Sequence, residues 1–155
     1  RVSEHSAATE SLKKTLDGQT ARMKAIRQLY DSSATFRSLK PIYDGLQKIK
    51  FEKPRAKYKA EHADELKMFY AARRKLTEEF PDGKVDMKKL SAEYDALEQA
   101  HETTYGEFKT VRDDLHRLWK VKSCVDTAAR FNERTEEQML QNRPQTRHKK
   151  EDISR

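Results

Sequence analysis

Glycine and proline are both scarce, with four of each in 155 residues. An all-β domain needs many tight turns, which these two residues usually supply, so the composition argues against a β-sandwich. The single cysteine, Cys124, excludes an intramolecular disulfide and a cysteine-based zinc cluster, and it is typical of a protein from a reducing cytoplasm. No run approaches the roughly 18 apolar residues of a membrane-spanning helix, and we find no secretory signal. We therefore expect a cytoplasmic protein without a membrane partner.

Charged residues are abundant in this chain. Lys, Glu, Arg, Ala and Leu dominate, as they do in long helices and coiled coils, and a hydrophobic share of 35% is too small for a large compact core. The formal net charge is +7, and it is unevenly distributed. Residues 37–75 hold twelve Lys or Arg and five Asp or Glu, whereas residues 76–106 hold three and eight. A basic block is therefore followed directly by an acidic one.

The clearest predicted element is a long helix over residues 86–131. Its seam positions recur at alternating steps of four and three, which is the heptad pattern of a coiled coil. Asp86 is the expected N-cap, because its carboxylate can accept the unpaired amide hydrogens of the first turn. The seam consists of Leu90, Tyr94, Leu97, His101, Thr104, Phe108, Val111, Leu115, Leu118, Lys122, Val125 and Ala129.

A partner arm is predicted over residues 5–50. Within it, "DSSATFRSLKP" interrupts the apolar stripe, and Pro41 lacks the amide hydrogen that a helix needs, so we expect a break there. Both arms span 46 residues, and this length match predicts an antiparallel pair with a broken outgoing arm and a straight returning one. The stripe consists of Leu12, Leu16, Gln19, Met23, Ile26 and Tyr30, followed by Phe36, Leu39, Ile42, Tyr43, Leu46 and Ile49.

Two short helices are predicted between the arms, over residues 54–80. Pro54 suits the first turn of one helix, and "FPDGKVD" supplies the turn that ends the other. The expected fold class is all-α: an elongated antiparallel helical hairpin, or coiled coil, with a small two-helix cap. Residues 1–142 would form one module, and residues 143–155 a polar basic tail.

The sequence offers little catalytic chemistry. The five histidines are far apart, so no His-x-x-x-His or His-x-His metal pair occurs. A glycine-rich phosphate loop and a Gly-x-Ser-x-Gly nucleophile elbow are both missing. Adjacent carboxylates such as Asp113 and Asp114 diverge on a helix and predict solvated faces. We therefore predict no catalytic residue, metal, cofactor or small-molecule substrate, and no enzyme activity for this chain by itself.

The basic block is the one candidate site. Cations spaced along its helices could contact the phosphates of a nucleic acid and release counterions, without reading the sequence. Tyr58 or Phe69 could stack on a base. The alternative is an ordinary solvated helix whose aromatic side chains pack inward. The predicted nucleic-acid-binding residues are Lys53, Arg55, Lys57, Lys59, Lys67, Arg73 and Arg74, with Tyr58 as the stacking residue.

Three stretches of the chain resemble a known family. They are "LQKIKFEKPRAKYKAEHADELKMFYAARRKL", "FPDGKVDMKKLSAEYDAL" and "EFKTVRDDLHRLWKVKSCVDTA". In this order they resemble the C-terminal helical region of relaxase/mobilization nuclease proteins of conjugative elements in Firmicutes, over residues 12–129. The residues that resemble the family most clearly are Tyr70 to Leu76 and Phe80 to Lys84.

The resemblance implies a context rather than a set of site residues. In that family a separate N-terminal domain nicks one DNA strand, with a Tyr that bonds to the DNA and a His cluster that holds the metal. That motif does not occur in this sequence, so no catalytic residue is transferred. The implied setting is a bacterial cytoplasmic protein that handles single-stranded DNA and engages a coupling protein. Arg1 in place of an initiator Met suggests a cut inside a longer relaxase.

From these features we predict two alternative functions, which belong to different classes. The first is a non-catalytic relaxase domain that assists conjugative transfer by holding single-stranded DNA. The second is a coiled-coil module for protein interaction or homodimerisation, whose exposed seam residues contact a second copy or the transfer machinery.

Overall fold

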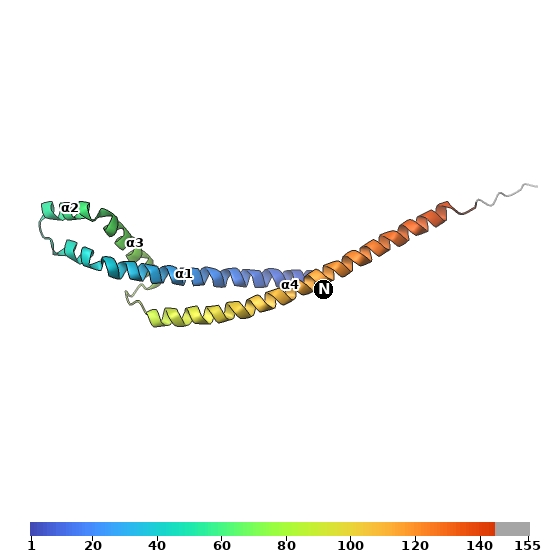
Figure 1. Cartoon of the computed structure of the whole chain (residues 1–155), viewed down its shortest axis with the longest axis horizontal. Coiled ribbons are helices and arrows are strands. Elements are labelled where there is room, and N and C mark those ends of the chain that lie inside the picture. The colour runs from blue at the N-terminus through green and yellow to red at the C-terminus, as the bar shows by residue number, and fades with distance from the viewer. Residues whose placement is uncertain (145–155) are drawn as a thin grey trace, which may run out of the picture.

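The helical periodicity of the sequence is realised in a computed structural model that describes residues 1–144. Within that range the secondary structure is entirely α-helical, and the elongated molecule is shown in Figure 1. The helices are α1 (Val2–Lys48), α2 (Glu52–Glu61), α3 (Ala63–Glu79) and α4 (Met87–Gln141). The predicted all-α fold, an elongated antiparallel hairpin with a two-helix cap, is confirmed.

Helices α1 and α4 form the antiparallel pair. Gln19 Nε2 of α1 donates to Thr104 Oγ1 of α4 at 3.3 Å, and Arg27 Nε donates to Tyr94 Oη at 3.0 Å. As the residue number rises along α1 it falls along α4, which is the register of two antiparallel helices. Beyond this paired region, the C-terminal part of α1 packs against α3 instead (Figure 1).

The main core lies where α1, α3 and α4 meet. Ile26 and Leu29 of α1, Leu76 of α3 and Leu90 of α4 form a buried apolar cluster, and Ile26 is completely inaccessible to solvent. Partly buried side chains from the turn between α3 and α4 and from α4 surround this cluster. One small core therefore holds three helices together, as expected for apolar stripes on long rods.

The predicted break at Pro41 is wrong, because α1 runs through it without interruption. Proline removes one hydrogen bond, the one that would run to the carbonyl of Arg37. Both Pro41 and Arg37 are exposed, so water can hydrate that carbonyl. The apolar stripe continues on both sides and is buried against α3, which offsets the local cost of the proline.

The predicted end-to-end match of two equal arms is also wrong. Helix α4 has 55 residues and α1 has 47. Helix α3 packs against the C-terminal part of α1, so α4 pairs with the N-terminal part. Helix α4 then extends past the N-terminus of α1 (Figure 1). The long helix, predicted over residues 86–131, continues to Gln141. Of the predicted tail, residues 145–155 lie outside the described residues.

The ends of α4 and α2 follow from local chemistry. Asp86 is the N-cap of α4, as predicted: its Oδ1 accepts a hydrogen bond from the amide of Lys89 at 3.0 Å. Helix α2 begins at Glu52, so Pro54 lies in its first turn. Gly83 in the turn before α4 has a φ of 72°, a left-handed conformation that favours glycine. Residues 1–144 contain no helix with an apolar stretch sufficient to cross a membrane.

Candidate nucleic-acid interface

A stack of aromatic rings holds α3 against α1 and so fixes the cap. Phe69 of α3 lies between Phe36 and Tyr43 of α1, with ring centroids 4.9 Å and 4.6 Å away and nearly parallel planes. Only 1% of Phe69 is exposed, so the alternative prediction that this ring stacks on a base is wrong. The pairing of three rings gives α3 one rotational setting about its axis, which decides which of its cations face the solvent.

Tyr58 fastens α2 to the end of α1. Its hydroxyl donates to the carbonyl oxygen of Ile42 at 2.9 Å, and its ring lies against His62 with centroids 4.4 Å apart. Gly45 of α1 makes room for it, because a Cβ at that position would lie 2.7 Å from the Tyr58 hydroxyl. Tyr58 is therefore engaged in packing, and its predicted role as a stacking platform gains no support from this geometry.

The solvent-facing side of the cap carries a shallow groove along α2 and α3, which we call the cap groove. Three of the predicted cations, Lys59, Lys67 and Arg74, line it. Its apolar wall includes Tyr70, whose side chain is 45% exposed. The remaining lining residues are Ala63, Leu66 and Ala71. Cationic side chains and an accessible aromatic ring therefore lie together in one concave surface.

The sequence alone misses Tyr70 as a site residue. Tyr70 occupies the same apolar stripe as Phe69, and the stripe alone indicates packing for both rings. Their different exposure depends on the angle at which α3 meets α1, which the stripe does not reveal. The useful signal was the spacing of Tyr70 with Lys67 and Arg74, three and four residues away on one helix face.

The other predicted cations are distributed around the cap. Lys53 and Lys57 are exposed on α2, and Arg55 is half-buried. Arg73 turns toward α1: its Nη1 donates to Tyr43 Oη at 3.4 Å, and the guanidinium lies 5.8 Å from the centre of the Tyr43 ring. The seven predicted cations thus do not form a single site.

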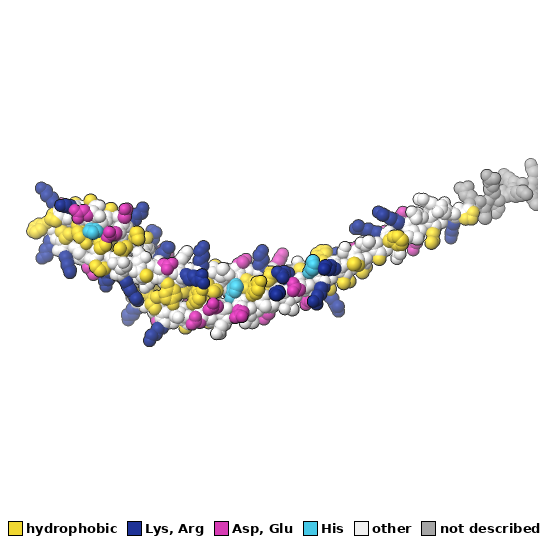
Figure 2. Space-filling view, in the orientation of Figure 1, with side chains coloured by type: hydrophobic (Ala, Val, Ile, Leu, Met, Phe, Trp, Pro, Cys, Tyr) yellow, Lys and Arg dark blue, Asp and Glu magenta, His cyan; other side chains and the backbone are white. Residues whose placement is uncertain are grey.

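None of these seven cations has a carboxylate within 4.0 Å among residues 1–144. The cap therefore presents net positive charge that is not neutralised by direct ion pairs. Figure 2 shows Lys and Arg side chains projecting from this end of the molecule. Such a surface attracts polyanions, and the attraction weakens as salt screens it.

Two acidic residues that follow the basic block, Glu79 and Glu93, are paired with Arg22. Arg22 of α1 donates to Glu79 of α3 at 2.6 Å, and to both oxygens of Glu93 of α4 at 2.6 Å and 3.1 Å. The guanidinium thus joins three helices beside the core. Its hydrogen bonds hold the pKa of each of the two carboxyl groups below its ordinary value, and the two carboxylates raise the pKa of Arg22. Sequence analysis did not identify this three-helix ion pair.

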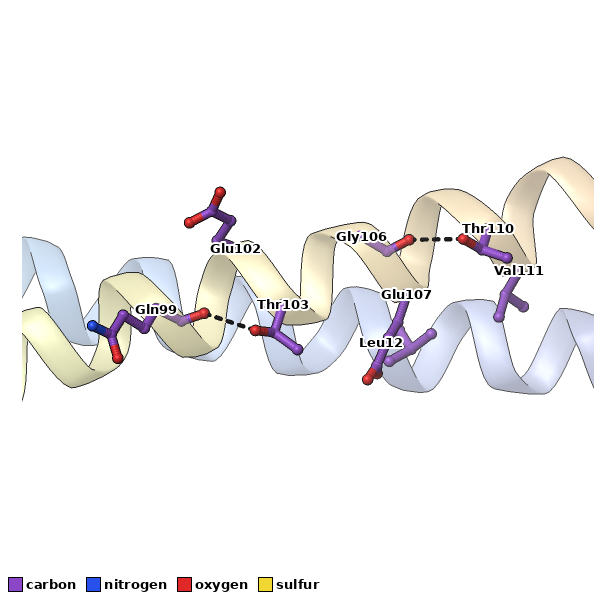
Figure 3. Close-up of a pocket in the computed structure, with 8 residues that line it drawn as sticks. All are labelled: Leu12, Gln99, Glu102, Thr103, Gly106, Glu107, Thr110 and Val111. Carbon is purple, nitrogen blue, oxygen red and sulfur yellow. Dashed lines mark hydrogen bonds between the residues drawn. The ribbon is translucent and has the colours of Figure 1, made fainter.

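A second hollow lies between α1 and α4 and suits a phosphate poorly. Figure 3 shows it beside Gly106, with Glu102 and Glu107 among its lining residues. The hydroxyls of Thr103 and Thr110 each donate to a carbonyl of their own helix at 3.1 Å. The local charge is negative and the hydroxyls are already bonded, so the cap groove is the better candidate for an anionic ligand.

Residues 1–144 contain no group of three or more His, Cys, Asp or Glu placed to hold a metal ion. Comparison of the chain with protein-family models, curated protein sequences and solved structures finds no match. Fold and surface define the class as an all-α helical hairpin with a basic cap.

Proposed function

We propose that this chain is a non-catalytic helical module that binds the phosphate backbone of single-stranded DNA through its cap. The observation that carries the proposal is the cap groove, where Lys59, Lys67 and Arg74 lie beside the half-exposed ring of Tyr70. The cations would contact successive phosphates, and Tyr70 would stack on a base that has left the duplex. Contacts of this kind bind many sequences with similar affinity.

Single-stranded DNA suits this surface better than a duplex. The groove follows one helix face and contains one accessible ring, which can stack only on an unpaired base. Lys53 and Lys57 on the neighbouring helix α2 would extend the positive surface beyond the groove. Under this proposal Arg73 contributes charge while it stays over the Tyr43 ring.

We propose conjugative transfer as the setting of this binding, in line with the sequence resemblance to relaxase/mobilization proteins. Under the proposal the module holds the nicked or transferred strand, while a nuclease domain of the parent protein performs the cleavage. A coupling protein would be the further partner. The basic cap supports the binding of DNA, and the sequence resemblance supports the relaxase context.

The test is the binding of a labelled single-stranded oligonucleotide, measured by fluorescence anisotropy over a series of salt concentrations. We expect affinity to fall steeply with salt. The triple variant Lys59→Ala, Lys67→Ala, Arg74→Ala should reduce the slope of log K against log salt by about 2, because three phosphate contacts are lost. Tyr70→Ala should weaken binding by about 1–3 kcal/mol with little change in the salt slope.

The matched control removes the same charge elsewhere. Lys13 and Lys14 are exposed on the N-terminal part of α1 and Lys109 is exposed on α4, and all three lie outside the cap groove. Their triple replacement by Ala should leave the salt slope nearly unchanged. Lack of binding at low salt, or equal losses for the two triple variants, would contradict the proposal.

A protein-interaction module is the second candidate function. It is favoured by a different part of the molecule, the end of α4, where large apolar side chains are exposed without a partner in residues 1–144. That surface is independent of the cap groove, so the two functions are compatible.

A further inference from the structure

The C-terminal part of α4 lacks a packing partner within the described residues. From residue 119 to residue 144 every side chain is exposed except that of Thr135, which is half-buried. Figure 2 shows hydrophobic side chains at intervals along this protruding rod. The large ones are Trp119 (50% exposed), Val121 (61%), Val125 (60%), Phe131 (69%), Met139 (68%) and Leu140 (64%). A single helix of this length is only marginally stable in water, so packing against a partner would stabilise it.

A regular stripe runs along this segment, and we call it the distal stripe. It consists of Val121, Val125, Ala128, Asn132, Thr135 and Met139. The steps between these positions alternate between four and three, so they lie along one face of the helix and repeat with the heptad period. The pattern is that of a coiled-coil seam with two polar positions.

The distal stripe departs from the line along which α4 packs on α1. Leu115 is a half-buried residue of the seam that packs on α1. At the heptad spacing, the same row of the helix continues through Lys122 and reaches Glu136 fourteen residues after Lys122. A helix that prolonged α1 along its present line would therefore meet these two charged side chains. The apolar row that replaces them begins at Val121 and lies on the other flank. The distal stripe shares Val125, Asn132 and Met139 with the continuation of the α1 line and is rotated from that line toward Val121.

The charges beside the distal stripe are arranged so that the segment complements itself. Residues 116–122 contain three cations and no carboxylate, namely Arg117, Lys120 and Lys122. Residues 133–137 contain three carboxylates, Glu133, Glu136 and Glu137, and the single cation Arg134. A second copy in antiparallel orientation brings the end of the basic segment, at Lys122, beside Glu136 of the acidic segment. A parallel, in-register copy instead places Arg117 beside Lys122 of the second copy, which is repulsive.

We propose that residues 118–142 of α4 pair with the same segment of a second copy in an antiparallel two-stranded coiled coil. Its two-fold axis passes near Arg130. The overlap begins where α1 ends its contact with α4, at the half-buried Leu118, and closes at Asn142, the C-cap of α4. It is about 37 Å long at the rise of an α-helix. The resulting dimer is a longer rod with one basic cap at each end.

The register follows from packing and charge together. In antiparallel coiled coils the two seam rows alternate across the interface. Val121 then faces Met139 of the second copy, and Val125 faces Thr135. Ala128 faces Asn132 at the centre. The two polar seam residues thus meet only small or apolar partners, so they set the register at a cost in stability.

The same register satisfies the flanks of the interface. Lys122 faces Glu136 of the second copy, and the symmetry makes this ion pair twice. Phe131, 69% exposed in the single chain, meets Phe131 of the second copy at the two-fold axis. Burial of the two rings against each other removes two highly exposed aromatic side chains from water.

The first test is the mass of the full chain in solution, by sedimentation equilibrium at micromolar concentrations. We expect twice the chain mass of 18.2 kDa. Val125→Glu should give a monomer, because each copy would bury an unpaired carboxylate in the seam. Ser123→Glu, an exposed position on the opposite face, is the matched control and should stay dimeric. A monomeric wild-type chain, or dimerisation unaffected by Val125→Glu, would overturn the proposal.

The orientation is tested by disulfide formation under oxidising conditions. In the proposed register the two copies of Cys124 are roughly 20 Å apart, too far for a disulfide, so the wild-type chain should stay unlinked. Phe131→Cys combined with Cys124→Ser should form a covalent dimer across the axis. Cross-linking through Cys124, or failure of the Cys at position 131 to link, would show that the antiparallel register is wrong.

The ion pairs give a third readout. Lys122→Glu or Glu136→Lys alone should weaken dimerisation by about tenfold, since each change creates two like-charge contacts, and the double exchange should restore it. Oligonucleotide binding by Val125→Glu, with a dimer-to-monomer change, separates this proposal from the cap groove. We expect monomeric Val125→Glu to bind the oligonucleotide with the salt slope of the wild type. A wild-type chain that dimerises without binding would contradict the cap groove alone, and one that binds as a monomer would contradict the coiled coil alone.

Discussion

At the scale of single residues, Arg22 of α1 forms hydrogen bonds to both α3 and α4. Its guanidinium bridges carboxylates of α3 and α4, and its side chain is 33% exposed, so these charges are only partly screened by water. The distances of 2.6 Å are those of charge-assisted hydrogen bonds. Arg22 thereby links α3 of the cap to α4 of the hairpin, although α3 and α4 pack against different parts of α1.

The ion pair predicts a pH dependence of stability. Hydrogen bonding to Arg22 lowers the pKa of Glu79 and of Glu93 from the ordinary value of 4.5. The folded state thus binds these protons less readily than the unfolded state, so the contribution is fully present above pH 4.5 and is lost as the pH falls through the folded pKa values. We expect the double variant Glu79→Gln, Glu93→Gln to be less stable than wild type at pH 7.

Urea unfolding of both proteins at several pH values measures this contribution. The difference in the free energy of unfolding should shrink steadily as the pH falls below 4.5. Exposed Glu78→Gln is the control and should track the wild type throughout. A difference that stays the same at acidic pH would mean that the carboxylate charges do not stabilise the contact between α1, α3 and α4.

Residue roles were only partly accessible from the sequence. The charge block located the cations of the cap, because charge is a property of the residues themselves. Which aromatic ring faces solvent was not accessible: Tyr58 reaches a carbonyl of α1 and Tyr70 remains half-exposed, although both lie in helical stripes. The difference arises from contacts between helices distant in sequence.

At the scale of elements, the continuity of α1 shows how packing overrides a local signal. A proline inside a helix costs about 3 kcal/mol relative to alanine. Pro41 is tolerated because Leu46, further along the helix, is completely buried and holds the continuation in place. Ser32 and Ser33 are also buried, which explains why the segment reads as polar although it lies in the interface with α3.

Replacement of this proline should stabilise the protein. Pro41→Ala restores one backbone hydrogen bond at an exposed position, and we expect a gain of about 1–3 kcal/mol in the free energy of unfolding. Chemical denaturation followed by circular dichroism measures the change. Lys40→Ala, at the exposed neighbouring position, should change stability by much less. A loss of stability in Pro41→Ala would indicate that the proline shapes α1 in a way that packing requires.

At the scale of the whole molecule, stability is concentrated at the junction of α1, α3 and α4. Leu90 is the one residue of α4 that is buried, and its partners Ile26 and Leu29 lie on α1. Away from this junction the rods are covered on one side only. The protein is therefore expected to unfold from its ends toward the junction, with the distal part of α4 least protected in the monomer.

The junction predicts a cooperative loss of structure. Ile26→Ala removes a side chain that is completely buried, and we expect a loss of about 2–5 kcal/mol. Because α3 and α4 both depend on this contact, hydrogen exchange should accelerate in both helices. Leu39→Ala, at a half-buried position outside the main cluster, should cost less and should leave α4 protected. Acceleration confined to α1 would show that the three helices unfold independently.

The sequence by itself determined the helical class, the heptad seam of α4, its Asp86 cap and the position of the basic block, because periodicity, capping and charge are local properties. The tertiary structure was needed to show that α1 passes through Pro41, that α3 packs on the C-terminal part of α1, and that α4 extends beyond α1 without a partner among residues 1–144. These outcomes depend on the free energy of packing between segments distant in the chain. That free energy depends on which apolar faces pack together. A local sequence pattern shows that a helix has an apolar face, but it does not show which helix packs on that face.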